Sequence, residues 1–264
     1  MRYQPVLNVL RAVLLSCAAA AGPLSAQSVV EHVAKGVAAN QARDPYAAIQ
    51  HFEAALAQDS ADYEANWRAA LTVLDLVDLL PDSLRHARRN SMYALAERYA
   101  KRAVRADAMG ADGHFAVAAT IGTGALVQPT DARIRRATIV RREALRAISL
   151  NPRHDGAYHI LGRWNAEIMR LTGVSRFVAR NFLGAGVFKQ ASWAKAIAYM
   201  KKAVELDSGR IHHHMELARI YADRKRAADA EAELHQVESL PIREAVDSIL
   251  KQQGAQLRRK LAQR

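Results

Sequence analysis

Residues 36–55, GVAANQARDPYAAIQHFEAA, decide the fold that the sequence predicts. Small or apolar residues recur there at fixed intervals, at Gly36, Ala48, Phe52 and Ala55. The next small residue that opens such a frame is Ala70, 34 residues after Gly36. A 34-residue period is typical of the tetratricopeptide repeat, in which two antiparallel helices pack closely through small side chains. The sequence therefore predicts stacked helix pairs.

Four more units extend the pattern along the chain. The last unit repeats the intervals without gaps, at Ala218, Ala230, Leu234 and Val237. The middle three units open at Ala70, Ala118 and Gly162 and fit only when extra residues are allowed between their paired helices. Their second helices carry Ala96, Ala100 and Ala103, then Val140, Ala144 and Ala147, then Ala196, Met200 and Ala203. An acidic or amide residue follows four second helices at one offset: Asp59, Asp107, Asn151 and Asp207.

The predicted fold is all-α, a tetratricopeptide-like α-solenoid of about five helix pairs with insertions in the middle three and a C-terminal capping helix. Half of the residues are apolar but only 6% are aromatic, which suits an alanine-rich solenoid. We expect one domain over 27–264, with units near 29–60, 61–108, 111–152, 154–208 and 210–240. Helices are predicted over 29–41, 45–58, 62–77, 91–106, 112–122, 134–149, 154–171, 191–206, 210–223, 226–238 and 242–262.

The first 26 residues have the pattern of a secretory signal. Arg2 and Arg11 supply positive charge, residues 12–21 form a short apolar run, and small residues precede a cleavage site after Ala26. The run is too short to span a bilayer, which needs about 20 residues. Export to a periplasm is therefore expected. Alternatively, Leu14-Leu15-Ser16-Cys17 matches a bacterial lipoprotein site, so anchoring through Cys17 stays open.

From about Asp62 to Ala262 the chain resembles the regulator of microtubule dynamics family. The resemblance is carried by YAKRA at 99–103, YHILGRW at 158–164, FLG at 182–184 and AVELD at 203–207. It implies a tetratricopeptide-like scaffold without catalytic activity, whose eukaryotic members associate with microtubules. An exported bacterial chain would not meet a microtubule, so tubulin is not expected as the partner.

The main functional prediction is a protein or peptide partner in the concave groove. In a stacked pair the first helix lines this groove, and residues three before, one after and five after its small position point inward. The frame nominates Trp67, Leu71, Asp75, Phe115, Ala119, His159, Arg163, Glu167, Met215, Arg219 and Asp223. Arg163 and Arg219 are equivalent in adjacent units, and two guanidinium groups suit a carboxylate. Alternatively, each pairs within its own helix, Arg163 with Glu167 and Arg219 with Asp223 or Glu216.

The net charge of +12 supports a second hypothesis. Six arginines lie within fourteen residues: Arg133, Arg135, Arg136, Arg141, Arg142 and Arg146. Such a cluster attracts anionic surfaces, so a peripheral envelope adaptor on an anionic membrane is the alternative function. Nucleic acid is not expected, because interleaved stacking aromatic residues are missing.

The sequence offers no support for catalysis, a cofactor or a metal. The consecutive residues His212, His213 and His214 point around a helix and do not converge on one ion. A glycine-rich phosphate loop and a serine nucleophile elbow are also missing. The amphipathic segment 172–191 contains three of the five phenylalanines. It is expected to pack on its own helix pair, and the alternatives are a lid over the groove or contact with a membrane interface.

Overall fold

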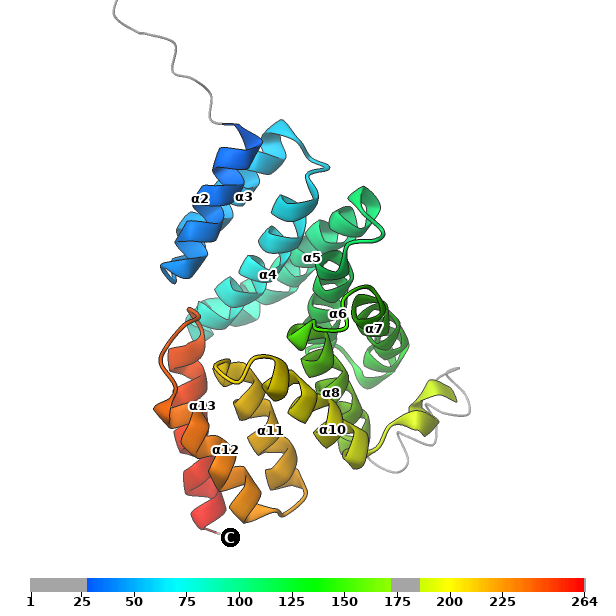
Figure 1. The fold of residues 1–264 in the computed structure, drawn as a ribbon, viewed down its shortest axis with the longest axis vertical. Helices are drawn as coiled ribbons and strands as arrows, with labels where there is room; N and C mark the ends of the chain where they lie inside the picture. Colours follow the sequence, from blue (N-terminus) through cyan, green and yellow to red (C-terminus); the bar gives the residue numbers. More distant parts are fainter. Residues whose placement is uncertain (1–27, 172–185, 264) are drawn as a thin grey trace, which may run out of the picture.

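The structure is a computed structural model that describes residues 28–171 and 186–263, and every regular element in these ranges is a helix (Figure 1). The helices are α2 (Val29–Gln41), α3 (Pro45–Gln58), α4 (Tyr63–Leu79), α5 (Asp82–Ala106), α6 (Ala111–Ala125), α7 (Thr130–Leu150), α8 (Asp155–Arg170), η1 (Gly186–Gln190), α10 (Trp193–Leu206), α11 (Ile211–Asp223), α12 (Ala227–Ser239) and α13 (Asp247–Ala262). Pairs form between α2 and α3, α4 and α5, α6 and α7, α8 and α10, and α11 and α12. The predicted all-α solenoid of helix pairs is confirmed.

Small residues let the paired helices approach closely. Ala48, Ala70 and Ala118 are fully buried. At Gly36 an added Cβ would collide with the ring of Phe52, which is itself fully buried in the facing helix. Close packing of this kind explains why the first position of each unit holds either glycine or alanine.

The acidic or amide residue that follows four of the second helices performs one local task. Each side chain accepts a hydrogen bond from the backbone N–H two residues further on, over 2.8–3.1 Å. The four residues are Asp59, Asp107, Asn151 and Asp207. This side-chain turn ends the helix and directs the chain into the next unit.

The predicted insertions differ in form from one unit to the next. In the second unit, α5 starts at Asp82 and runs unbroken to Ala106, so the prediction that this helix begins at 91 was wrong. In the third, α7 begins at Thr130 rather than at 134. Pro81 and Pro129 precede these starts. The sequence did indicate a helix start at Leu80-Pro81-Asp82-Ser83, but the polar first turns hid its continuity with 91–106, and hid the start of α7, from a search for apolar periodicity. The extra residues of these two units therefore lengthen helices.

The last helix also starts later than the predicted 242. The backbone N–H groups of Arg243 and Glu244 donate to the Asp247 carboxylate, at 2.8 and 2.7 Å, and hold residues 243–246 in a turn. Helix α13 follows and packs on α11 and α12, in the place of a capping helix. Its buried Leu250 joins Met215, Leu234 and Val246 in one apolar cluster.

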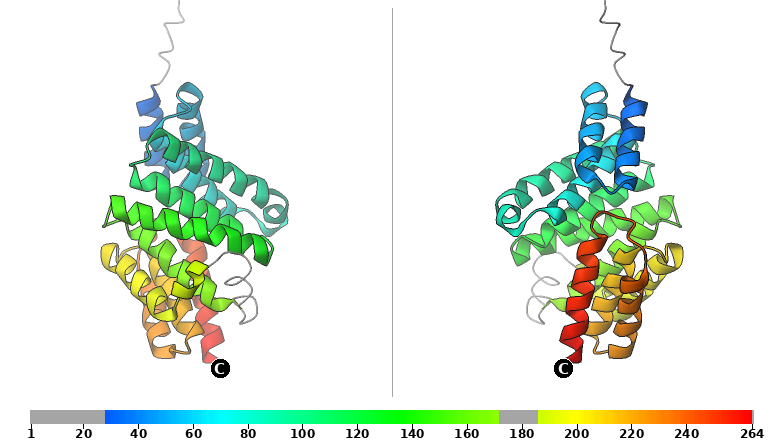
Figure 2. Two further views of the ribbon diagram at one scale, coloured as in Figure 1. Left: turned by 90° about the vertical axis from the view of Figure 1, so that its right-hand side faces the viewer. Right: turned by 90° about the vertical axis from the view of Figure 1, so that its left-hand side faces the viewer.

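The solenoid curves until its two ends meet. Helices α2 and α3 lie at one end, the chain turns through α6 and α7, and the segment before α13 returns beside the first hairpin (Figures 1 and 2). Arg43, between α2 and α3, donates from Nη1 to the carbonyl oxygen of Ile242 at 3.3 Å, across 199 positions in the sequence.

The predicted signal segment 1–26, the alternative anchor Cys17 and most of the 172–191 segment lie outside the described residues. Within that segment, Phe188 is buried and meets Trp164 edge to face at 5.8 Å, so this part packs on its own unit. Among residues 28–171 and 186–263, the helices are all too short or too polar to cross a bilayer.

Candidate functional site on the concave side

The inner wall of the solenoid is built by the first helices of the units. Helices α4, α6, α8 and α11 touch one another in this order. Three of the residues predicted to face the groove, Ala119, His159 and Met215, are buried instead. Met215 is 1% exposed because α13 covers it, and His159 is 6% exposed because it packs against His212 and His213.

Two aromatic groove candidates are half-buried, and each lies against a polar neighbour. Trp67 lies beneath the guanidinium of Arg68, 4.3 Å from the ring centre, and Phe115 lies 4.6 Å from the ring of His154. Leu71 is half-buried against the core. These side chains contribute to the wall of α4 and α6.

Charged residues gather where α8, α11 and α13 meet. Arg170 is the centre of this cluster and pairs with Glu167 at 2.7 Å, with Glu216 at 3.3 Å and with Asp223 at 2.7 Å. Burial lowers the pKa of Arg170, but Glu216 and Asp223 outweigh it and hold the pKa above its usual value. Arg170 therefore remains charged and orders three carboxylates.

The predicted pair of guanidinium groups is not symmetric in the structure. Arg219 is occupied, because it donates to Glu216 at 3.2 Å and to the side-chain oxygen of Gln253 in α13. One alternative read from the sequence, the pairing of Arg219 with Glu216, is thus present. Arg163 has no ion pair or hydrogen bond from its side chain within the described residues, and Glu167 pairs with Arg133 and Arg170 instead.

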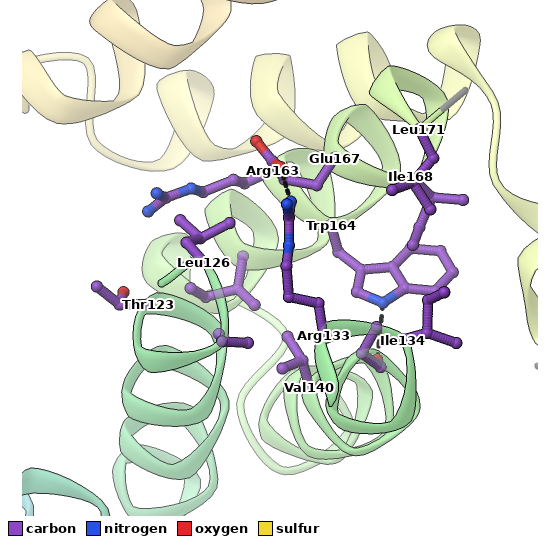
Figure 3. A pocket seen from close by; sticks show the side chains of 14 residues that line it. Thr123, Leu126, Arg133, Ile134, Val140, Arg163, Trp164, Glu167, Ile168 and Leu171 are labelled. Carbon is purple, nitrogen blue, oxygen red and sulfur yellow. Dashed lines mark hydrogen bonds and ion pairs between the residues drawn. The ribbon is translucent and has the colours of Figure 1, made fainter. Parts of the chain in front are cut away.

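Arg163 stands between two adjoining cavities. The first is apolar and lies between α6, α7 and α8, where Leu126, Ile134, Val140, Ile160 and Ile168 line it (Figure 3). The second is polar and is lined by the charged cluster together with Leu257, Lys260 and Leu261 of α13. Arg163 and Glu167 line both. We call this pair of cavities the Arg163 site.

Two polar contacts in the wall of the apolar cavity are made within the chain. The Trp164 indole N–H donates to the carbonyl oxygen of Ala137 at 2.7 Å, and Arg133 pairs with Glu167 at 3.1 Å (Figure 3). Arg163 extends past Leu126, away from Trp164 (Figure 3). A guanidinium group without a partner therefore lies beside an apolar cavity.

Sequence reasoning missed Arg133, Arg170 and Lys260 as parts of this site. Arg170 had a detectable signal, because it lies seven residues after Arg163, two turns along the same face of α8. Lys260 had no signal in the sequence, because its position depends on how α13 folds back onto α11. Arg133 was predicted to belong to the group of six arginines that attracts anionic surfaces.

The six arginines predicted to attract anionic surfaces each have a partner. The partners are Glu167 for Arg133, Asp131 for Arg135, Glu97 for Arg136, Gln190 for Arg141, Glu143 for Arg142 and the Met109 sulfur for Arg146. Arg142 keeps most of its side chain exposed. The cluster along α7 is therefore largely engaged within the chain.

A buried histidine network lies behind the site, between α8 and α11. His213 donates from Nε2 to Asp155 at 2.9 Å, and its Nδ1 lies 3.0 Å from His159 Nδ1. Because a carboxylate only accepts, the neutral His213 ring has Nδ1 free to accept from His159. Burial holds the pKa of His159 and His212 well below their usual range, and nearby positive side chains add to it. These rings are neutral packing groups.

The three consecutive histidines have separate partners, and His212 lies edge to face with the His159 ring, with 4.7 Å between the ring centres. His213 faces Asp155, whereas His214 faces Glu233 at 2.7 Å. Over the described part of the chain, His, Cys, Asp and Glu side chains nowhere form a group of three able to hold a metal ion.

Comparison with known proteins identifies the family. The family profile described as Regulator of microtubule dynamics protein 1-3 matches residues 31–262. Regulator of microtubule dynamics protein 1 from Bos taurus is 25% identical over 150 residues, which are 57% of this chain and 46% of the bovine protein. The protein of the same name from Pongo abelii matches to the same extent. The chain spans about half the length of these curated relatives.

Solved structures show the same fold. A tetratricopeptide protein from Thermus thermophilus has a TM-score of 0.58 at 18% identity, over 87% of this chain and 98% of that chain. PilF from Pseudomonas aeruginosa has a TM-score of 0.50 at 14% identity, over 89% of this chain and 86% of that one. Fold and family profile agree, and the chain belongs to the regulator of microtubule dynamics family.

Proposed function

We propose that this protein is an exported, non-catalytic scaffold that binds a segment of a partner protein on its concave side, at the Arg163 site. The observation that carries the proposal is the unpaired guanidinium group of Arg163 between an apolar and a polar cavity. A half-buried cation without a partner is costly in an isolated fold but useful as a contact for a carboxylate. Interaction scaffolds are also common among helical repeat proteins, whose curved stacks present extended concave surfaces.

The direct test is photo-cross-linking from the site. The full chain would carry benzoylphenylalanine at Thr123, which lines the apolar cavity, and would be irradiated in an envelope extract. We expect one discrete cross-linked protein, whose yield falls strongly with Arg163→Glu. Arg98→Glu is the matched control, because Arg98 is exposed on α5 and lines neither cavity.

A partner that cross-links equally well to the Arg163→Glu and Arg98→Glu variants would show that it does not bind through Arg163. Arg219→Glu is a second test: Arg219 lies in the polar cavity but is already paired. Its substitution should weaken capture less than Arg163→Glu does.

Attraction to an anionic membrane is the alternative function from the sequence. The partners of the α7 arginines do not favour it, since four of the six, Arg133, Arg135, Arg136 and Arg142, are paired with carboxylates within the chain. Sedimentation with anionic vesicles separates the two proposals. Salt-sensitive binding that is lost with Arg135→Gln and Arg142→Gln, but kept with Arg163→Glu, would favour the membrane.

The names of the relatives raise tubulin as a partner. The predicted export signal opposes it for this chain. Co-sedimentation of the full chain with polymerised tubulin tests this directly, and we expect none.

A further inference from the structure

The geometry points to a specific ligand chemistry at the Arg163 site: the apolar cavity receives one aliphatic side chain of the bound segment, and Arg163 pairs with a carboxylate on a neighbouring residue of that segment. The inference rests on the proposed function and adds the class of sequence that is recognised.

The apolar cavity fits a group of a few carbon atoms. Its volume is about 70 Å³, several times the roughly 10–15 Å³ needed for one water. Water inside it would find few polar partners besides Arg163 and Thr123, because the Trp164 N–H, Arg133 and Glu167 are already bonded. Burial of aliphatic surface against Leu126 and Ile160 is therefore the favourable way to fill the space.

The excess positive charge around the two cavities favours an acidic residue close to the aliphatic one in the bound segment. Five cationic side chains lie in or beside the two cavities, and three carboxylates oppose them, which leaves an excess of two positive charges. The cations are Arg133, Arg163, Arg170, Arg219 and Lys260, and the carboxylates are Glu167, Glu216 and Asp223. All three carboxylates are already in ion pairs, whereas Arg163 and Lys260 have none within the described residues.

The aliphatic and acidic groups must be close together in the ligand. Arg163 lines both cavities, so a carboxylate that meets its guanidinium group lies next to the entrance of the apolar cavity. Leu, Ile or Val two positions before or after Asp or Glu meets this condition within a single extended segment, because side chains two positions apart lie on the same face.

A random peptide library displayed on phage and selected on the full chain tests the inference. We expect enriched sequences in which a large aliphatic residue lies within two positions of Asp or Glu. An enriched peptide should bind about ten-fold more weakly to Arg163→Gln, the effect of losing one charge-assisted hydrogen bond. It should also lose affinity when its own acidic residue is replaced by the matching amide.

Filling the apolar cavity gives an independent readout. Gly122→Leu places a side chain in the cavity and should abolish selection for the aliphatic residue. Gly122→Ala is the matched control, because an added Cβ there meets only the Val140 methyl groups, at 3.6 and 3.7 Å. Ala137→Leu fills the cavity from α7 and replaces Gly122→Leu if the latter fails to fold, as judged by circular dichroism.

The outcomes separate this inference from the proposed function. Peptides that respond to Arg163→Gln but not to the filling variants would overturn the aliphatic subsite and leave the scaffold intact. Enrichment of peptides without acidic residues, or of none at all, would overturn the ligand class, while cross-linking from Thr123 would still decide the scaffold. A fatty acid that co-purifies with the full chain, and is lost in Gly122→Leu by native mass spectrometry, would show a different occupant and also overturn the inference.

Discussion

Gly162 sets the distance between helices α8 and α10, because it carries a hydrogen atom where alanine would carry a methyl group. A Cβ at this position would lie 2.9 Å from the Met200 methyl group, 3.1 Å from its backbone nitrogen and 3.2 Å from the carbonyl oxygen of Ala196. The last two are backbone atoms, so the helices would have to separate. The first unit also holds glycine at this position, Gly36, whereas the equivalent Ala70, Ala118 and Ala218 of the other three units are fully buried alanines.

Gly162→Ala is therefore expected to destabilise the protein even though alanine is the better helix former. Overpacking costs about 1–3 kcal/mol, and the gain in helix propensity offsets about 1 kcal/mol of this. Chemical denaturation should show a net loss of up to about 2 kcal/mol. Gly122→Ala, where the added methyl group has room, should show no loss or a small gain in stability.

A histidine makes the same two hydrogen bonds in two units, one to a glutamate and one to a backbone carbonyl oxygen. His114 lies 2.6 Å from the Glu143 carboxylate and 3.0 Å from the Ala108 carbonyl oxygen. His214 lies 2.7 Å from the Glu233 carboxylate and 2.9 Å from the Ser208 carbonyl oxygen. Each lies four residues before the small residue of its frame. The frame thus fixes a polar contact as well as an apolar one, and this contact was not predicted from the sequence.

The His214–Glu233 pair predicts a pH dependence of stability. Burial lowers the pKa of His214, but its bonds to Glu233 and the Ser208 carbonyl outweigh burial and raise the pKa above its usual value. The folded state then holds a proton that the unfolded state loses near pH 6.5, so the stabilisation is complete below that pH and declines as the pH rises through the folded pKa. Glu233→Gln should lower the Tm at pH 5.5 and have a smaller effect at pH 8.5. An equal loss at both values would contradict the assignment.

At the scale of elements, the packing of α13 accounts for most of the site features that could not be predicted from the sequence. The repeat spacing predicted the helix pairs, because small residues at fixed intervals depend only on the local packing of two helices. Whether Met215 is exposed and Arg219 unpaired depends on where α13 packs. The polar last turn of α13 predicted a solvated end and gave no indication of these contacts. Arg163 and Arg219 hold equivalent positions in the frame and were therefore predicted to act alike, but the contacts of Arg219 with Glu216 and Gln253 separate them.

Helix α13 should stabilise the last unit as a further repeat would. Leu250 is buried in the cluster with Met215, Leu234 and Val246, so Leu250→Ala is expected to cost about 2–5 kcal/mol. In a solenoid each unit is stabilised mainly by its neighbours, so the loss should be local. Hydrogen exchange should speed up over 211–262 and stay unchanged over 29–106. Ala255→Ser, at an exposed position of α13, is the control.

The whole molecule is a curved solenoid whose ends are joined at one charged junction. The segment 240–246 reaches the first hairpin through Arg43 and Ile242, and Arg210 binds Asp155 at 3.0 Å and Glu244 at 2.9 Å. Asp75 of α4 faces the same junction. Burial, followed by the neighbouring carboxylates Glu244, Asp78 and Asp247, raises its pKa to about 7, although Arg210 opposes the shift.

Closure of the solenoid should therefore weaken as the pH rises through 7. The folded state keeps Asp75 protonated up to about pH 7, whereas the unfolded state ionises near 3.8, so stability falls between these values and the charge repulsion is complete above them. Asp75→Asn removes the repulsion and should raise the Tm at pH 8 but not at pH 4. Spin labels on cysteines at the exposed positions Gln41 and Ser239, with Cys17 replaced by serine, report the closure directly. A single short distance at pH 6 should broaden towards longer distances at pH 8, and Asp75→Asn should keep it short. Distance distributions that do not change with pH in either protein would show that contacts other than Asp75 hold the ends together.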